Sequence, residues 1–166
     1  MIAREKDGAV NIYPRRGFTT LELLVVIAIL LILAAIALPN LSGWARNQRL
    51  KGVARDLMSH FQFARLEAIK SSTTVVLTFY PDLGLIKGSY IVSKDGVTLI
   101  DVRMPAGVTL DSTTFTADQA GYNSRGFPVL GAGGGGWVEL RTDPPGRTYR
   151  VIMQHTSGGL SLDGPL

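Results

Sequence analysis

Glu22 is the residue whose type and position most clearly predict chemistry in this chain. It stands near the start of a long apolar run, and residues 23–38 after it include no polar side chain. A carboxylate in apolar surroundings is costly unless it pairs with a cation or reaches water. Glu22 therefore needs either water, as at a membrane boundary, or a cation nearby.

Other residue types that carry chemistry are not arranged for catalysis or metal binding. The chain has no cysteine, which excludes disulfides, thiolate metal sites and a cysteine nucleophile. His60 and His155 are far apart, and neither has a metal-ligating residue at helical spacing. The glycine-rich stretch 131–136 is followed by Trp137 and lacks the Gly-Lys-Ser/Thr of a phosphate-binding loop. The sequence thus predicts no enzyme, no metal site and no cofactor.

Basic side chains gather in the segment after the apolar run. The candidates for a contact surface are Arg46, Arg49, Lys51 and Arg55. A solvated helix face or attraction to anionic lipid headgroups explains such a cluster, and contact with nucleic-acid phosphates is the alternative. The formal net charge is +4, and half of this excess lies in residues 1–17, so the remaining field is weak for nucleic acid.

The apolar run from Phe18 to Leu38 is long enough to span a bilayer as a helix. Basic residues precede it and tend to stay in the cytoplasm, which predicts an external C-terminal domain. Two other interpretations stay open from the run alone. A cleaved secretory signal would use Ala35-Ile36-Ala37 as its small-x-small site, and a plain anchor would hold Glu22 at the water boundary.

A second helical pattern follows. Apolar residues recur at intervals of three and four from Leu50 to Ala68, which marks one face of a helix. We predict one helix from Phe18 to Ile69, bent near Pro39 because proline removes an internal hydrogen bond. Its second half is expected to pack on a sheet.

Strand-like segments separated by turn residues occupy the rest of the chain. They are residues 75–80, 89–93, 97–103, 108–110, 137–141, 149–153 and 160–162. The order of elements predicts an α+β fold, with one long helix lying across an antiparallel sheet. Residues 111–136 are expected to form a loop without an assigned element, and the strand order is left open.

Residues 15–40, RRGFTTLELLVVIAILLILAAIALPN, resemble the class III signal of type IV pilins and type II secretion pseudopilins. In that family a prepilin peptidase cleaves after a glycine, here Gly17, and the new N-terminal residue, here Phe18, is N-methylated. The family's acidic residue corresponds to Glu22 and its helix-bending proline to Pro39. The resemblance implies that Glu22 neutralises the N-terminus of a neighbouring subunit and sets the register between apolar helices.

Later stretches are similar to the GspH/FimT branch of pseudopilins and minor pilins, namely residues 63–79, 123–128 and 149–162. The branch implies a minor pseudopilin of the type II secretion pseudopilus, acting in filament assembly or at the tip and in protein secretion. The alternative is a minor type IV pilin in pilus biogenesis that binds DNA for uptake. The basic Gly-Arg-x-Arg-like motif of such DNA binders would fall on residues 158–161, which lack arginine. Nucleic acid is therefore disfavoured as a partner, though not ruled out.

The resemblance implies three parts of the chain. Residues 1–17 are a cytoplasmic leader that is removed, residues 18–39 a transmembrane and filament-core half-helix, and residues 40–166 a periplasmic pilin-like α+β domain. The expected location is the inner membrane, crossed once, and then the pilus or pseudopilus. The expected partners are the prepilin peptidase, other pilins or pseudopilins, and the membrane. The sequence hardly distinguishes a type II secretion filament from a type IV pilus.

Overall fold

The computed structural model describes residues 18–84, 88–129, 135–142 and 146–165, and for residues 37–42 it describes the helical backbone alone. The structure divides into two units, Met1–Asn40 and Leu41–Leu166. The predicted leader, residues 1–17, lies outside the described residues.

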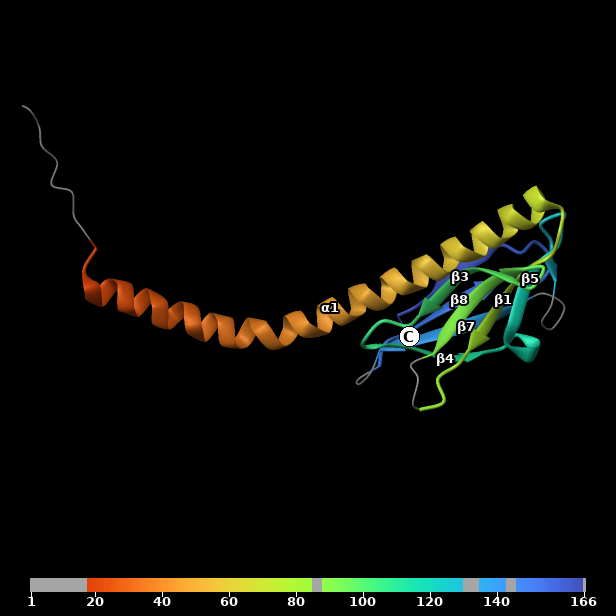
Figure 1. Cartoon of the computed structure of the whole chain (residues 1–166). Coiled ribbons are helices and arrows are strands. Elements are labelled where there is room, and N and C mark those ends of the chain that lie inside the picture. The colour runs from red at the N-terminus through yellow and green to blue at the C-terminus, as the bar shows by residue number, and fades with distance from the viewer. Residues whose placement is uncertain (1–17, 85–87, 130–134, 143–145, 166) are drawn as a thin grey trace, which may run out of the picture. The chain divides into compact units, whose positions relative to one another are not determined.

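Helix α1 runs from Thr20 to Ser71, within two residues of the predicted bounds (Figure 1). It ends in a Schellman motif, in which the N–H of Thr73 donates to the carbonyl of Ala68 at 3.2 Å and that of Ser72 to Ile69 at 3.3 Å. Ser72 has φ +54°, the left-handed conformation that this motif requires. The chain then turns directly into the first strand.

Two antiparallel sheets follow the helix, where the sequence predicted one. The five-stranded sheet has the order β3-β2-β1-β5-β6, and the four-stranded sheet the order β4-β7-β8-β9. The first comprises β1 (Val75–Tyr80), β2 (Ser89–Lys94), β3 (Val97–Arg103), β5 (Gln119–Tyr122) and β6 (Pro128–Val129). The second comprises β4 (Val108–Thr113), β7 (Gly136–Thr142), β8 (Thr148–Met153) and β9 (Leu160–Asp163), and the 3-10 turn η1 (Thr116–Asp118) lies between β4 and β5.

All seven predicted strands are present, but the description of residues 111–136 as a loop was wrong. This segment contains the end of β4, then η1, β5 and β6. Strand β5 pairs with β1 over Val75↔Tyr122 to Thr78↔Gln119, which makes it an interior strand of its sheet.

One hydrophobic core joins the second half of α1 to both sheets. The buried helix face repeats every three or four residues, and strands β1, β2, β7 and β8 bury alternate residues, as the two periodicities require. The helix face consists of Leu50, Ala54, Leu57, Phe61, Ala64 and Ala68. At its centre the ring of Phe61 lies 6.0 Å from Phe79 and 6.4 Å from Phe115, between ring centroids. In Figure 1 this half of α1 lies along the strands.

Candidate functional site

Glu22 lies in the first turn of α1, where it has a local role that the sequence analysis missed. Its backbone N–H donates to Oγ1 of Thr19 at 3.2 Å, so Thr19 caps the helix. Threonine followed three residues later by glutamate is the spacing of a capping box. A carboxylate in the first turn is also favoured by the helix dipole. The spacing was visible in the sequence and predicts that Glu22 helps the helix begin.

The carboxylate of Glu22 is exposed, and among the described residues it forms no ion pair. Phe18, four positions earlier, is 82% exposed. Gly17, the predicted cleavage position, lies outside the described residues. The capping role therefore leaves the carboxylate of Glu22 accessible to a cation from another molecule.

The first half of α1 exposes apolar side chains on every side. From Leu21 to Ile36, the exposed fraction of each leucine, isoleucine and valine lies between 45% (Val26) and 72% (Ile36). A helix that is apolar all round is stable only when lipid or other protein covers it. This half of the helix therefore needs an apolar covering.

Within the described residues, no helix meets both the length and the apolarity needed to cross a membrane. The predicted span, residues 18–39, reaches into residues 37–42, whose side chains lie outside the described part. The predicted kink at Pro39 falls in the same segment. Span and kink both stay predictions.

The four basic residues predicted as a contact surface form two separate pairs. Arg46 lies one turn from Arg49, and Lys51 one turn from Arg55, but a rotation of about 200° along the helix separates Arg49 from Lys51. Nη1 of Arg49 donates to the carbonyl of Ala106 at 2.8 Å, so this side chain fastens the helix to the loop after β3. Arg46 and Arg55 are exposed, and Lys51 is half-buried.

The two histidines lie in different surroundings. Nδ1 of His60 and the hydroxyl of Tyr90 are 2.8 Å apart, and the Tyr90 side chain is fully buried. Burial raises the pKa of Tyr90, with a smaller contribution from the negative charge of Asp56, so its hydroxyl stays neutral. His155 is exposed. In the part of the chain that the structure describes, no three histidine, aspartate or glutamate residues are grouped to hold a metal ion.

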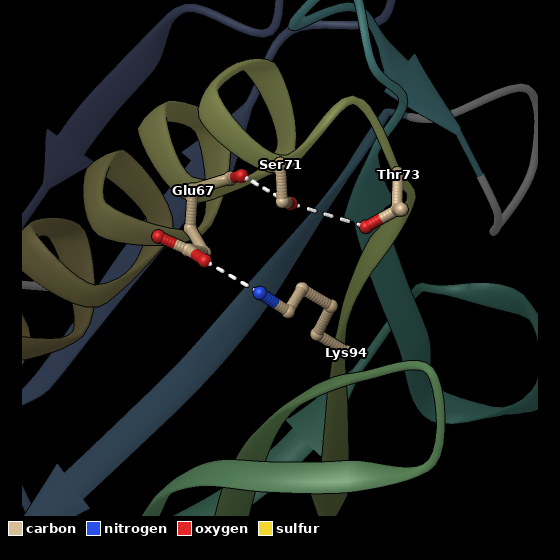
Figure 2. A network of polar contacts seen from close by, with 4 residues as sticks. All are labelled: Glu67, Ser71, Thr73 and Lys94. Carbon is tan, nitrogen blue, oxygen red and sulfur yellow. Dashed lines mark hydrogen bonds and ion pairs between the residues drawn. The ribbon is translucent and has the colours of Figure 1, made fainter.

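A polar network fastens the end of α1 to the hairpin of β2 and β3 (Figure 2). Nζ of Lys94 donates to Oε1 of Glu67 at 2.7 Å, and Oγ of Ser71 donates to the Glu67 carbonyl at 2.6 Å. The hydroxyls of Ser71 and Thr73 are 3.1 Å apart. The hydrogen bond from Lys94 is the main cause that lowers the pKa of the Glu67 carboxyl. The network positions the helix-to-strand junction.

A pocket of about 420 Å³ opens on the five-stranded sheet. Its apolar lining includes Tyr80, Leu83 and Ile91, and its charged lining is Asp101 and Arg103. General acid–base catalysis needs two groups that can exchange a proton with a substrate. A single carboxylate beside a guanidinium, both on an exposed strand, does not provide such a pair, so the pocket is not arranged for catalysis.

Comparison with known proteins gives the following likenesses. The family model for type II transport protein GspH matches residues 53–157, and that for the prokaryotic N-terminal methylation motif matches residues 13–38. The pilin-like protein PilA1 of Thermus thermophilus is 32% identical over 130 residues, which cover 78% of this chain and 68% of the relative. The type IV minor pilin FimU of Pseudomonas aeruginosa matches in structure with a TM-score of 0.50 and 14% identity, over 72% of this chain and 91% of that one. This structural likeness confirms the predicted fold, a long N-terminal helix packed on antiparallel strands.

Proposed function

Since this chain belongs to the type II transport protein GspH family and carries an N-terminal methylation motif, we propose that it is a minor pseudopilin of a type II secretion system. The family consists of structural, pilin-like proteins rather than enzymes, as the sequence analysis predicted. The methylation motif implies processing by a prepilin peptidase and suggests anchoring in the inner membrane, and pilin-like proteins have filament partners. The finer proposal is that this subunit acts in assembly at or near the filament tip, and through it in secretion.

The first half of α1 is the observation that carries this proposal. Its apolar side chains are exposed on every side, from Leu21 to Ile36. Burying one such side chain completely is worth about 1.5–3 kcal/mol, so packing among neighbouring helices or lipids supplies a large driving force. That force is not directional, and it does not by itself fix how far one helix slides along another.

Glu22 supplies the missing register in this proposal. Cleavage after Gly17 creates a free α-amine on Phe18, and the exposed carboxylate of Glu22 pairs with the amine of a neighbouring subunit. An ion pair is stronger in low dielectric than in water and depends on a short distance. It therefore favours one axial position over the alternatives that leave a charge unpaired, as a buried polar residue does in coiled coils.

The proposal is tested with two variants of the full chain. Gly17→Ala should block processing, which the intact mass of the membrane-extracted protein reports directly. Glu22→Gln should leave processing intact but lower the amount of protein recovered with sheared filaments, because the register-setting charge is lost. Thr19→Ala is the matched control, since it removes the helix cap but keeps the carboxylate. Recovery of Glu22→Gln at the wild-type level would show that the carboxylate does not act in assembly.

A minor type IV pilin is the second candidate function. The relative from Thermus thermophilus is a pilin-like protein and the structural match is a type IV minor pilin, which favours this candidate. A strain that lacks this protein distinguishes the two candidate functions. Loss of protein secretion with normal pili supports the pseudopilin, and loss of pili with normal secretion supports the minor pilin. DNA binding within the second candidate would use cations such as Arg46 and Arg55, and a salt-dependent mobility-shift assay tests it.

A further inference from the structure

The outward side of α1 near its C-terminal end carries apolar side chains that the fold does not bury. Phe63, Leu66 and Ile69 are 40%, 67% and 46% exposed. A spacing of three places successive residues next to each other on a helix surface. The outward face of a helix in a water-exposed domain is normally polar, so this stripe requires another explanation.

The loop after β5 packs against α1 beside this stripe. Gly126 is buried against the helix, since a Cβ at this position would lie 2.7 Å from Cδ1 of Ile69 and 3.3 Å from Nε of Arg65. Oδ1 of Asn123 accepts the N–H groups of Arg125 at 2.9 Å and Phe127 at 3.0 Å, which fixes the loop. Phe127 is 52% exposed. The two neighbours of Gly126 therefore border the helix stripe, one cationic and one aromatic.

The cations of this region are available to a partner. Among the described residues, neither Arg65 nor Arg125 forms an ion pair, and Glu67 is engaged by Lys94. The guanidinium of Arg65 lies 5.9 Å from the ring centroid of Tyr122. Arg65 and Gln62 also line a pocket of about 100 Å³, together with Tyr122 and residues 158–160. This pocket offers donors to a carboxylate and is too small for more than one side-chain head.

We propose that the helix–loop surface, defined as Phe63, Arg65, Leu66, Ile69, Arg125 and Phe127, docks an acidic and apolar segment of a neighbouring filament subunit. One carboxylate of that segment enters the pocket beside Arg65, and a second faces Arg125. Apolar side chains between them cover Leu66, Ile69 and Phe127. That the segment belongs to a filament subunit rests on the proposed function. That it is acidic and apolar is inferred from this surface alone.

The pattern of side chains favours a protein segment over nucleic acid. Single-stranded nucleic acid binds by stacking bases on aromatic rings along a cationic groove. Leu66 and Ile69, which lie on the same helix as Arg65, offer no ring for stacking. An apolar surface of mixed aliphatic and aromatic side chains, with one arginine on each element, instead matches leucine-like side chains flanked by carboxylates.

A peptide-binding titration of the full chain in detergent micelles tests the docking surface. The probe is a synthetic peptide that alternates glutamate and leucine. The control peptide has glutamine in place of each glutamate. We expect the glutamate peptide to bind more tightly and to weaken as salt rises. Arg65→Glu combined with Arg125→Glu should lower its affinity by about tenfold or more. Leu66→Gln, at a position that is largely exposed, should also weaken binding without lowering Tm.

The control is Lys51→Glu combined with Arg55→Glu, which makes the same charge change at two positions of α1 outside the helix–loop surface. Equal loss in this control, or equal binding of the glutamine peptide, would overturn the proposal. So would binding of a single-stranded DNA probe through Arg65 and Arg125 without peptide binding. Self-association that Leu66→Gln abolishes in sedimentation would assign the surface to a second copy instead. Filament recovery of Glu22→Gln is independent of this assay, so failure of the docking surface and failure of the proposed function are distinguishable.

Discussion

The two halves of α1 are both rich in apolar residues, yet they are stabilised in different ways. In the first half every leucine, isoleucine and valine from Leu21 to Ile36 is exposed, and even Val26 is 45% exposed. In the second half a stripe that includes Leu57 and Phe61 is completely buried against the sheets. The difference lies in the arrangement of the apolar residues, which is all-round in the first half and periodic in the second. Apolar content predicts that a helix needs covering, and periodicity predicts whether its own chain can do it.

The largest expected effect separates the two halves directly. Phe61→Ala should lower the free energy of unfolding by about 3–5 kcal/mol, because it leaves a cavity beside the stacked rings of Phe79 and Phe115. Leu30→Ala, at a side chain that is 58% exposed, should leave that free energy unchanged. Urea unfolding of the full chain in detergent, followed by circular dichroism, measures both. Similar losses in the two variants would mean that the halves unfold together.

Two glycines with positive φ separate the cost of side-chain crowding from the cost of backbone strain. Gly158 has φ +62°, and a Cβ there would lie 2.8 Å from the ring of Tyr122. Gly158→Ala should lower the free energy of unfolding by about 1–3 kcal/mol through strain and crowding. Gly96 also has positive φ, +79°, but open space around it. Gly96→Ala should therefore cost only the backbone part, about 1 kcal/mol, and equal costs would remove the packing argument.

The end of α1 should tolerate glycine better than its middle does. Ser72 has φ +54°, a conformation that glycine adopts without steric cost. Ser72→Gly should raise the free energy of unfolding by about 0.5–1 kcal/mol. Ser59→Gly, at an exposed position inside the helix, should lower it by a similar amount. The two variants have opposite expected signs, so a thermal melt of each, compared with the wild type, suffices as the measurement.

The smallest expected effect is the pH dependence from Glu67. Lys94 lowers the pKa of this carboxyl in the folded state, so the ion pair contributes stability above the usual glutamate pKa. That contribution is lost as the pH falls through the lowered value. Glu67→Gln should remove this part of the acid sensitivity and leave Tm near neutral pH slightly reduced. Asp56→Asn is the comparison, and a matching change in its acid profile would contradict the assignment to Glu67.

Several features were predictable because they depend on local pattern. The bounds of α1 follow from apolar spacing, and the seven predicted strands follow from alternation between turn residues. Strand β5 was missed because its sequence, Gln119-Ala-Gly-Tyr122, has small residues with weak strand preference. It becomes a strand because it pairs with the edge of β1, a long-range contact that no local pattern reports. The division into two sheets depends on the same kind of contact.

The candidate site shows the same limit. The position of Glu22 in the apolar run was evident from the sequence, and its capping spacing with Thr19 was present but not used. The basic residues after Pro39 were predicted as one surface. The structure separates them, because helical rotation divides Arg49 from Lys51 and because Arg49 is tied to Ala106. The docking surface could not be predicted, since it joins Ile69 to Phe127 through the packing of Gly126.

The sequence by itself determined that this protein has one long helix with an all-round apolar first half, a lone carboxylate at its start, and an α+β domain after it. These properties depend on residue type and on spacing over a few turns. Only the tertiary structure decided which strands share a sheet, which cations are occupied, and which apolar side chains remain uncovered. Those outcomes depend on contacts between residues far apart in the chain. Each such contact costs loop-closure entropy and gains free energy from apolar burial, and the gain is realised only when the whole core forms.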